Sequence, residues 1–414
     1  MPADAVLDDL VKVADDRVRE ARSDDAIDGR PSRYVATPAS TEETAELLRV
    51  AARHGLHVVT RGSGTKQRWG NPPGQVDLVV ETTAIAGVVE HAAGDLITVV
   101  RAGTTMSDLQ AALAVADQQL ALDTPIPSAT VGGTVATDTS GPRRLLYGTM
   151  RDLLIGITFV RADGVVARAG GKVVKNVAGY DFGKLLTGSY GTLGIITEVA
   201  LRLHPVPATQ RMVTMQDDDA DAAARAARRV LGSQVVPAAV EVDQPVDGPV
   251  TVAVLLEGIE AGVGARTAAT RALLGAGSTV VETPGWFGKY PFGIDDVGLK
   301  ITTTLVGVGP VLMTVRDAGR KHGVPVAVRG SAGGVLYASM PSDTRSEVVA
   351  SVLGEIRTIA AAYDGTVVVL TAPAETRRGL DVWGPVGGLD LMRRLKDQLD
   401  PDHRLSPGRF VGGI

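Results

Sequence analysis

Glycine-rich segments that directly follow strand-like runs constrain this chain most. The first, "TRGSGTKQRWGNPPG" at 60–74, comes straight after an apolar run that predicts a short strand at 56–60. The second is "PSATVGGTVATDTSG" at 127–141, and the third is "KNVAGYDFGKLLTGSYGTLGIITEVALRL" at 175–203. Because glycine lets the backbone approach a ligand closely, these loops predict an α/β protein that holds a ligand on its loops.

Size and composition limit the classes of protein that this chain can belong to. Its 414 residues exceed one ordinary core, so two domains are expected. The net charge of −5 gives no general attraction to nucleic acid, and the chain has no cysteine for disulfides or thiolate-bound clusters. The first residues lack the apolar core of a signal peptide, and no apolar run approaches a membrane span. We therefore expect a cytoplasmic protein that binds no nucleic acid.

The first glycine loop has the chemistry of an anion site. Gly62 and Gly64 flank Ser63, which allows successive amides to converge, while Thr65 and Lys66 add a hydroxyl and a positive charge. The pattern matches neither the dinucleotide fingerprint nor the P-loop. A plain surface turn is the alternative interpretation, and whether Lys66 or Arg68 reaches a phosphate or only solvent stays open.

The order of the motifs is more specific than any single motif. "RGSGTK", "ATVGGTVATDTSG", "YGTMRDLLIG", "VKNVAGYDFGKLLTGSYGTLGIITEVAL" and "LSPGR" follow one another along the chain. This order resembles the flavin-binding oxidoreductases of the vanillyl-alcohol oxidase type, which have a PCMH-type FAD domain, from about residue 34 onward. The stretch "RWGNPP" and the short cap with "LSPGRF" are most similar to the E-type flavin subunits of glycolate oxidase.

The resemblance implies an α+β chain with a two-domain PCMH-type FAD-binding fold. Two α/β subdomains would bind FAD, and an α+β, ferredoxin-like cap would carry the substrate. Residues 1–33 would form an N-terminal helical extension, 34–208 the FAD-binding domain and 209–384 the cap. Residues 385–414 would return to the FAD domain. No internal repeat is evident in the sequence.

The resemblance also implies which residues contact FAD. The first loop would take the pyrophosphate, the second loop the ribityl chain and the isoalloxazine, and the third segment the adenine end. In chain order, these candidates are Arg61, Gly62, Ser63, Gly64, Thr65, Thr130, Val131, Gly132, Gly133, Ala136, Ser140, Gly141, Gly148, Arg151, Gly194, Ile195 and Ile196.

Several departures from the family pattern modify this expectation. Many relatives attach FAD through a histidine after the first glycines, where this chain has Thr65 and Lys66, so non-covalent FAD is predicted. Tyr190 stands where related dehydrogenases have glutamate, and Ser406 replaces an asparagine near the C-terminus. The cap stretch "VRGSAGGVLYA" at 328–338 lacks the metal-binding histidines of catalytic relatives. No metal is therefore expected, and the six histidines are interpreted as structural or solvated.

Candidate catalytic groups are consequently few. Tyr180, with Asp181 and Lys175, lies in a loop that relatives bring near the flavin, and Arg329 and Tyr337 of the cap suit a substrate carboxylate. Ordinary packing is the alternative for each.

We expect an FAD-binding subunit of a glycolate oxidase-like complex that oxidises a small 2-hydroxy acid. A sister flavin subunit and an iron–sulfur subunit would be its partners, and any membrane contact would be indirect, at the inner face and through those partners. The alternatives are a self-sufficient FAD-dependent glycolate or D-lactate dehydrogenase and a non-catalytic scaffold with a vestigial FAD site.

Overall fold

The structure, a computed structural model, describes residues 5–171 and 179–414, which fall into two compact units. Unit 1 contains the chain up to Thr139, together with Thr149–Val206 and Val386–Ile414. Unit 2 contains Ser140–Gly148 and Pro207–Pro385. The C-terminal segment thus lies in the same unit as the first glycine loop.

The first subdomain of unit 1 is a small mixed sheet with two helices. The sheet order is β1-β2-β4-β3, and β2, β4 and β3 run parallel. Helix α2 begins after Ser40, whose side-chain oxygen caps it by accepting a hydrogen bond from the backbone amide of Glu43. The bounds are α1 Ala5–Ala14, β1 Val18–Glu20, β2 Tyr34–Ala36, α2 Thr41–Arg53, β3 Val58–Arg61 and β4 Leu78–Glu81.

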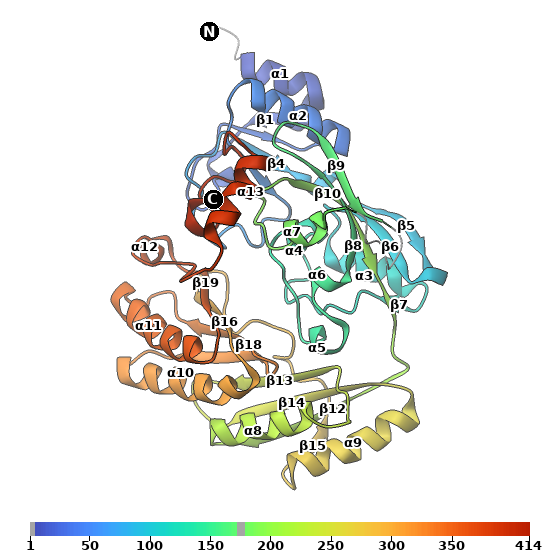
Figure 1. Cartoon of the computed structure of the whole chain (residues 1–414), viewed down its shortest axis with the longest axis vertical. Helices are drawn as coiled ribbons and strands as arrows, with labels where there is room; N and C mark the ends of the chain where they lie inside the picture. The colour runs from blue at the N-terminus through green and yellow to red at the C-terminus, as the bar shows by residue number, and fades with distance from the viewer. Residues whose placement is uncertain (1–4, 172–178) are drawn as a thin grey trace. The chain divides into compact units, whose positions relative to one another are not determined.

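The second subdomain of unit 1 is an antiparallel sheet of order β5-β6-β10-β8-β9. Asp163 and Gly164 lie in the turn of a hairpin formed by β8 and β9. Short helices accompany the sheet (Figure 1), and their apolar side chains share one core with it. The bounds are β5 Val88–Ala92, β6 Ile97–Arg101, α3 Met106–Ala114, β7 Gln118–Gln119, α4 Val131–Ala136, α6 Met150–Leu153, β8 Leu154–Val160, β9 Val166–Gly170, α7 Phe182–Leu186, β10 Ile195–Arg202 and β11 His204–Pro205.

Unit 2 is an eight-stranded antiparallel sheet with order β15-β12-β14-β13-β17-β18-β16-β19. Four helices, α8 to α11, pack on it and share a single large apolar core (Figure 1). The bounds are β12 Thr209–Asp217, α8 Ala220–Leu231, β13 Ala239–Gln244, β14 Val250–Gly258, α9 Glu260–Leu274, β15 Thr279–Val281, β16 Val297–Thr302, α10 Val308–His322, β17 Ala327–Ser331, β18 Val335–Met340, α11 Ser346–Ala362 and β19 Val367–Thr371.

This sheet contains an internal repeat that the sequence did not reveal. Residues 209–281 and residues 297–371 each run strand, helix, two strands, helix, strand, and each half has the ferredoxin-like strand order 4-1-3-2. The two halves join edge to edge where β13 pairs antiparallel with β17. The expectation of no internal repeat was therefore wrong, because the halves share topology and burial pattern rather than residues.

The segment 140–148 is held in unit 2 by polar contacts. The guanidinium of Arg143 donates to a carboxylate oxygen of the buried Glu257 at 2.9 and 2.5 Å, and the Tyr147 hydroxyl donates to the other oxygen at 3.0 Å. Helix α5 (Arg144–Tyr147) lies between these two residues in sequence. Sequence reasoning placed this segment wholly within the first domain, because it had no means of seeing Glu257 as the partner.

Candidate functional site

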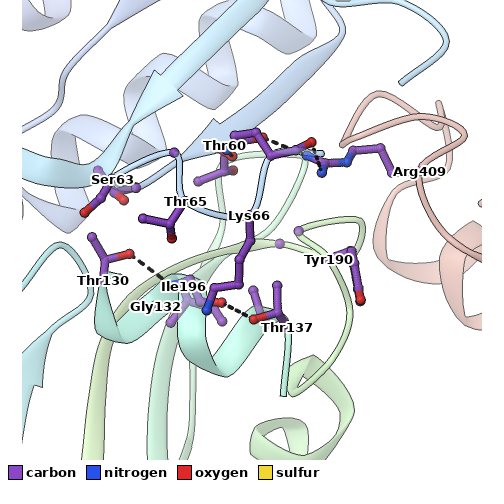
Figure 2. Close-up of a pocket in the computed structure, with 18 residues that line it drawn as sticks. Thr60, Ser63, Thr65, Lys66, Thr130, Gly132, Thr137, Tyr190, Ile196 and Arg409 are labelled. Atoms are coloured by element: carbon purple, nitrogen blue, oxygen red, sulfur yellow. Dashed lines mark hydrogen bonds between the residues drawn. The ribbon is translucent and has the colours of Figure 1, made fainter. Parts of the chain in front are cut away.

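Unit 1 contains a pocket where the first and second glycine loops meet. Figure 2 shows the lining side chains, which come from the loop after β3, from α4, from the loop before β10 and from the C-terminal segment. The lining residues are Thr60, Gly62, Ser63, Gly64, Thr65, Lys66, Gln67, Thr82, Thr130, Gly132, Gly133, Ala136, Thr137, Tyr190, Gly191, Gly194, Ile196 and Arg409.

The first loop offers backbone donors to the pocket. Among the described residues, no acceptor receives the amides of Ser63, Gly64 and Thr65. Gly64 has φ +74°, a conformation that favours glycine and lets the chain turn at this point. Consecutive amides without protein acceptors at the end of a strand form the kind of concave donor surface that binds phosphate groups.

The second loop approaches the first closely enough to require glycine. The Thr130 hydroxyl caps α4 by accepting the Gly133 amide at 3.2 Å. A Cβ atom on Gly62 would lie 2.2 Å from that hydroxyl oxygen, so only glycine fits at this position without movement. On the other side, a Cβ on Gly132 would lie 2.8 Å from the Ala102 Cβ. The two glycines therefore hold both loops against each other and against β6.

Lys66 contributes a buried amine to this pocket. Its side chain is almost fully buried, and its Nζ donates to the Thr139 hydroxyl at 3.2 Å and lies 5.7 Å from the centre of the Trp69 ring. Figure 2 shows the chain of Lys66 reaching across the pocket toward Thr137. Burial lowers the pKa of Lys66 to about 7. Lys66 therefore faces the pocket rather than solvent, and its contact with a phosphate stays a prediction.

Arg409 connects the C-terminal segment to the first loop through hydrogen bonds. Its guanidinium donates to the Gln67 side-chain oxygen at 2.9 Å and to the backbone oxygens of Gln67 and Trp69 at 2.8 and 3.0 Å. Ser406 donates its amide to the Val58 oxygen at 2.8 Å, which places the same segment beside β3. The end of the chain therefore forms part of the wall of the pocket.

The residues in this pocket fit FAD. Unpaired amides of the first loop and the buried amine of Lys66 are donors suited to a diphosphate, and the glycines of both loops leave room for an extended ligand. Of the expected FAD contacts, ten line the pocket: Gly62, Ser63, Gly64, Thr65, Thr130, Gly132, Gly133, Ala136, Gly194 and Ile196.

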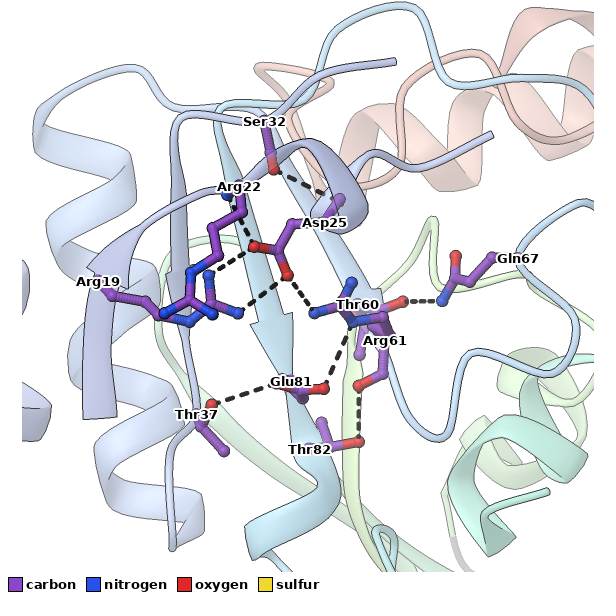
Figure 3. Close-up of polar contacts among 10 residues, drawn as sticks. All are labelled: Arg19, Arg22, Asp25, Ser32, Thr37, Thr60, Arg61, Gln67, Glu81 and Thr82. Carbon is purple, nitrogen blue, oxygen red and sulfur yellow. Dashed lines mark hydrogen bonds and ion pairs between the residues drawn. The ribbon is translucent and has the colours of Figure 1, made fainter. Parts of the chain in front are cut away.

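The side chain of Arg61 does not line the pocket (Figure 3). It donates to Asp25 at 2.9 Å and lies 3.4 Å from a Glu81 oxygen. Asp25 is buried and also accepts both terminal nitrogens of Arg19. Sequence reasoning placed Arg61 on the pyrophosphate, but a diphosphate contact through its guanidinium would require these ion pairs to open. Arg61 instead ties the first loop to the N-terminal extension.

This network predicts an acid-sensitive contribution to stability. The guanidinium of Arg19, with help from the Arg22 amide and Arg61, holds the pKa of Asp25 well below its usual range. The stabilisation is therefore present above about pH 4, the ordinary aspartate pKa, and is lost as the pH falls further toward the folded-state value. Asp25→Asn should lower the free energy of unfolding by about 1.5–3 kcal/mol at neutral pH.

The measurement is urea unfolding of wild type and Asp25→Asn across the acid range. The gap between the two proteins should narrow as the pH falls below about 4. Asp24→Asn is the neighbouring control and should behave like wild type. A gap that stays constant through the acid range would contradict the assigned role of the Asp25 charge.

The other residues expected to contact FAD do not line this pocket. Val131 and Ile195 are fully buried in the apolar cores of unit 1, and Arg151 is exposed on α6. Ser140, Gly141 and Gly148 belong to the segment grouped with unit 2. Their proposed contacts with FAD stay predictions.

Of the catalytic candidates, Arg329 and Tyr337 are neighbours in unit 2. They pair across β17 and β18, and the register continues to Lys300 on β16 and Asp243 on β13. Arg329 donates to Asp243 at 2.7 Å and its guanidinium lies 5.5 Å from the centre of the Trp286 ring. Residues next in sequence to this row, such as Val242 and Val328, belong to the core under the helices, so the row lies on the opposite face of the sheet.

Tyr180 is placed in unit 1, where 87% of its surface is exposed and its ring meets the edge of Phe182. Asp181 caps α7 by accepting the Lys184 amide at 3.0 Å. Lys175 lies outside the described residues.

The histidines all have side-chain partners. The pairs are His54 with Asp9, His57 with Asp77, His91 with Gln118, His204 with Arg202, His322 with Glu355 and His403 with Asp397. In the part of the chain that the structure describes, no group of three histidine, cysteine or acidic residues could hold a metal ion. Within that same part, no helix is both long and apolar enough to cross a membrane.

Sequence reasoning missed several residues that line the pocket. Thr137, Gln67, Tyr190 and Arg409 belong to the quoted motifs but were given no contact with the cofactor. Their position beside glycine loops was a signal, but only the fold shows that the C-terminal "LSPGRF" lies against the loop after β3.

Comparison with known proteins defines the class. A profile described as the FAD binding domain matches residues 32–170, and one described as the C-terminal domain of FAD linked oxidases matches residues 382–410. The fold is also similar to the solved structure of p-cresol methylhydroxylase with substrate bound, with a TM-score of 0.74, 15% identity, and coverage of 98% of this chain and 96% of that chain. The chain therefore has the PCMH-type FAD-binding fold and is similar to FAD-linked oxidases.

Within this class, two similar proteins are subunits of glycolate oxidase. The chain is 29% identical to glycolate oxidase subunit GlcD of Bacillus subtilis, over 91% of this chain and 88% of that protein. It is 36% identical to subunit GlcE of Escherichia coli over 39% of this chain, and this match spans only about half of that protein (47%). The chain is thus related to both kinds of subunit.

Proposed function

We propose that this chain is an FAD-binding component of a system that oxidises a small 2-hydroxy acid to a 2-oxo acid. The observation that supports it best is the unit 1 pocket, where unpaired amides, glycines and a buried amine converge in a form that suits FAD. The substrate class is inferred from similarity to glycolate oxidase subunits. When bound, FAD would supply the two-electron chemistry, by accepting a hydride from the carbon that bears the hydroxyl.

The residues of unit 2 suit recognition of a hydroxy acid. We propose that the Arg329 guanidinium binds the carboxylate, since its planar fork matches that group, and that Lys300 adds positive charge to the same row. Asp243 accepts a hydrogen bond from Arg329. A substrate carboxylate would therefore either share the Arg329 guanidinium with Asp243 or replace Asp243 as its partner. The Tyr337 hydroxyl would hold the substrate hydroxyl, and Tyr180 of unit 1 is retained as a second candidate. All three roles are proposals.

The partners are proposed from the similarity to glycolate oxidase subunits, and the composition of the chain is compatible with them. Without cysteine, this chain has no thiolate for an iron–sulfur cluster, so electrons would leave through a partner iron–sulfur subunit, beside a sister flavin subunit. A cytoplasmic location, with membrane contact only through such partners, is part of the same proposal.

The alternative is a self-sufficient FAD-dependent dehydrogenase for glycolate or D-lactate. The observation that favours it is the pairing of Arg329 with Tyr337 across β17 and β18 of unit 2, two side chains that could bind a hydroxy acid. The test is to mix the isolated protein, loaded with FAD, with glycolate or D-lactate and a dye acceptor. We expect little or no turnover without partners. Steady turnover by the isolated chain would overturn the subunit proposal and support the alternative. A protein that takes up no FAD would support a scaffold role.

A further inference from the structure

Lys66 is an unusual cation for a phosphate-binding pocket because it is buried before any ligand arrives. Only 8% of the residue is exposed, and within the described chain its amine forms a hydrogen bond with Thr139 and no ion pair with a carboxylate. A charged ammonium in such a place loses its hydration without full compensation, so burial favours the neutral amine. The charge of Lys66 is therefore sensitive to what enters the pocket.

The groups around Lys66 do not supply a negative charge. The Trp69 ring and the Thr139 hydroxyl are its neighbours, and Thr137 and Tyr190 line the same pocket. Asp138 precedes Thr139 in sequence, but burial alone accounts for the lowered pKa of Lys66 and no carboxylate offsets it. The other cation among the described lining residues, Arg409, already donates to Gln67 and Trp69.

We propose that, above neutral pH, FAD binding places a proton on Lys66, so that the buried amine is neutral before binding and becomes an ammonium that offsets part of the charge of the diphosphate. This inference rests on FAD as the ligand of the unit 1 pocket. The diphosphate is doubly negative and fully ionised near neutral pH, and in a poorly hydrated pocket its attraction for a positive charge is strong. Lys66 belongs to the same loop as the unpaired amides of Ser63, Gly64 and Thr65, so the charge and the donors act on one ligand.

The sign of the pH dependence follows from this coupling. FAD raises the affinity of Lys66 for its proton, so the protonated protein binds FAD more tightly. Since the pKa of Lys66 before binding is about 7, affinity should be nearly constant below neutral pH and should fall above it. The fall approaches about tenfold per pH unit while the bound form stays protonated.

Isothermal titration of the FAD-free protein with FAD tests the proposal. At about pH 8, titrations in HEPES and in Tris, which differ in ionisation enthalpy and contain no phosphate, should show uptake of close to one proton per FAD. Lys66→Met should abolish the uptake and the pH dependence together. Lys66→Arg, which is charged at every relevant pH, should bind FAD without taking up a proton.

Two outcomes would overturn the proposal: no proton uptake by wild type at about pH 8, or uptake that persists in either variant. Thermal melts of all three proteins show whether they are folded, and if Lys66→Met does not fold, Lys66→Arg decides the question alone. A wild-type protein that binds no FAD at any pH would overturn the cofactor assignment itself, which is a different result from FAD binding without proton uptake.

Discussion

Asp400→Ala is expected to destabilise unit 1 by about 3–5 kcal/mol, because it leaves a fully buried ammonium without its counter-charge. Lys396 and Asp400 are both completely buried, with Nζ 2.6 Å from the carboxylate. Lys396 also donates to the backbone oxygens of Thr192 and Leu405, at 2.8 and 2.9 Å. The pair therefore joins α13 (Leu389–Leu399), the loop before β10 and the C-terminal segment. Urea unfolding measures the effect.

Two further variants make this result interpretable. Asp390→Asn, on the same helix, removes an exposed carboxylate that pairs with Arg393 at 3.4 Å, and should change stability by less than about 0.5 kcal/mol. Replacing both buried charges, Lys396→Met with Asp400→Leu, should cost less than Asp400→Ala, because no charge is then left unpaired. If Asp400→Ala were as stable as Asp390→Asn, the buried pair would contribute little to the stability of unit 1.

Gly62→Ala is expected to weaken FAD binding roughly ten- to a hundredfold. The added Cβ would lie 2.2 Å from the Thr130 hydroxyl, so the first loop must move or the cap of α4 must break. Overpacking of this kind costs about 1–3 kcal/mol, and 1.4 kcal/mol corresponds to a factor of ten in affinity. Flavin absorbance per chain after gel filtration, followed by release on denaturation, measures both occupancy and the expected non-covalent attachment.

Gly74→Ala is the matched control for Gly62→Ala. Gly74 follows in the same glycine-rich stretch, and its Cβ would meet the Pro407 oxygen at an ordinary 3.7 Å. This variant should keep wild-type FAD content. Equal FAD loss in both variants would mean that the contact with Thr130 is not what makes Gly62 necessary. Flavin that stays with the denatured chain would contradict non-covalent binding.

Local signals predicted much of unit 1. Ser40 and Glu43 mark the start of a helix, and the turn residues mark the β8–β9 hairpin. The first glycine loop follows the end of β3, and the second contains the short helix α4. These features depend on residues close together in sequence, for which propensity and capping are informative. The internal repeat of unit 2 escaped detection because many different apolar sequences produce the same buried strands and helices.

The sequence by itself indicated the PCMH-type FAD-binding fold, because the order of its glycine motifs resembles that of known FAD-binding proteins, and it determined the residue types available to the pocket. Only the tertiary structure decided how those residues are used. Arg61 turns to Asp25, Lys66 is buried beside Thr139, Arg409 crosses from the far end of the chain to Gln67, and Arg143 pairs with Glu257. Each of these partners is distant in sequence. The position of a charged side chain depends on which polar partners the fold brings near it, because those partners offset the cost of removing the charge from water.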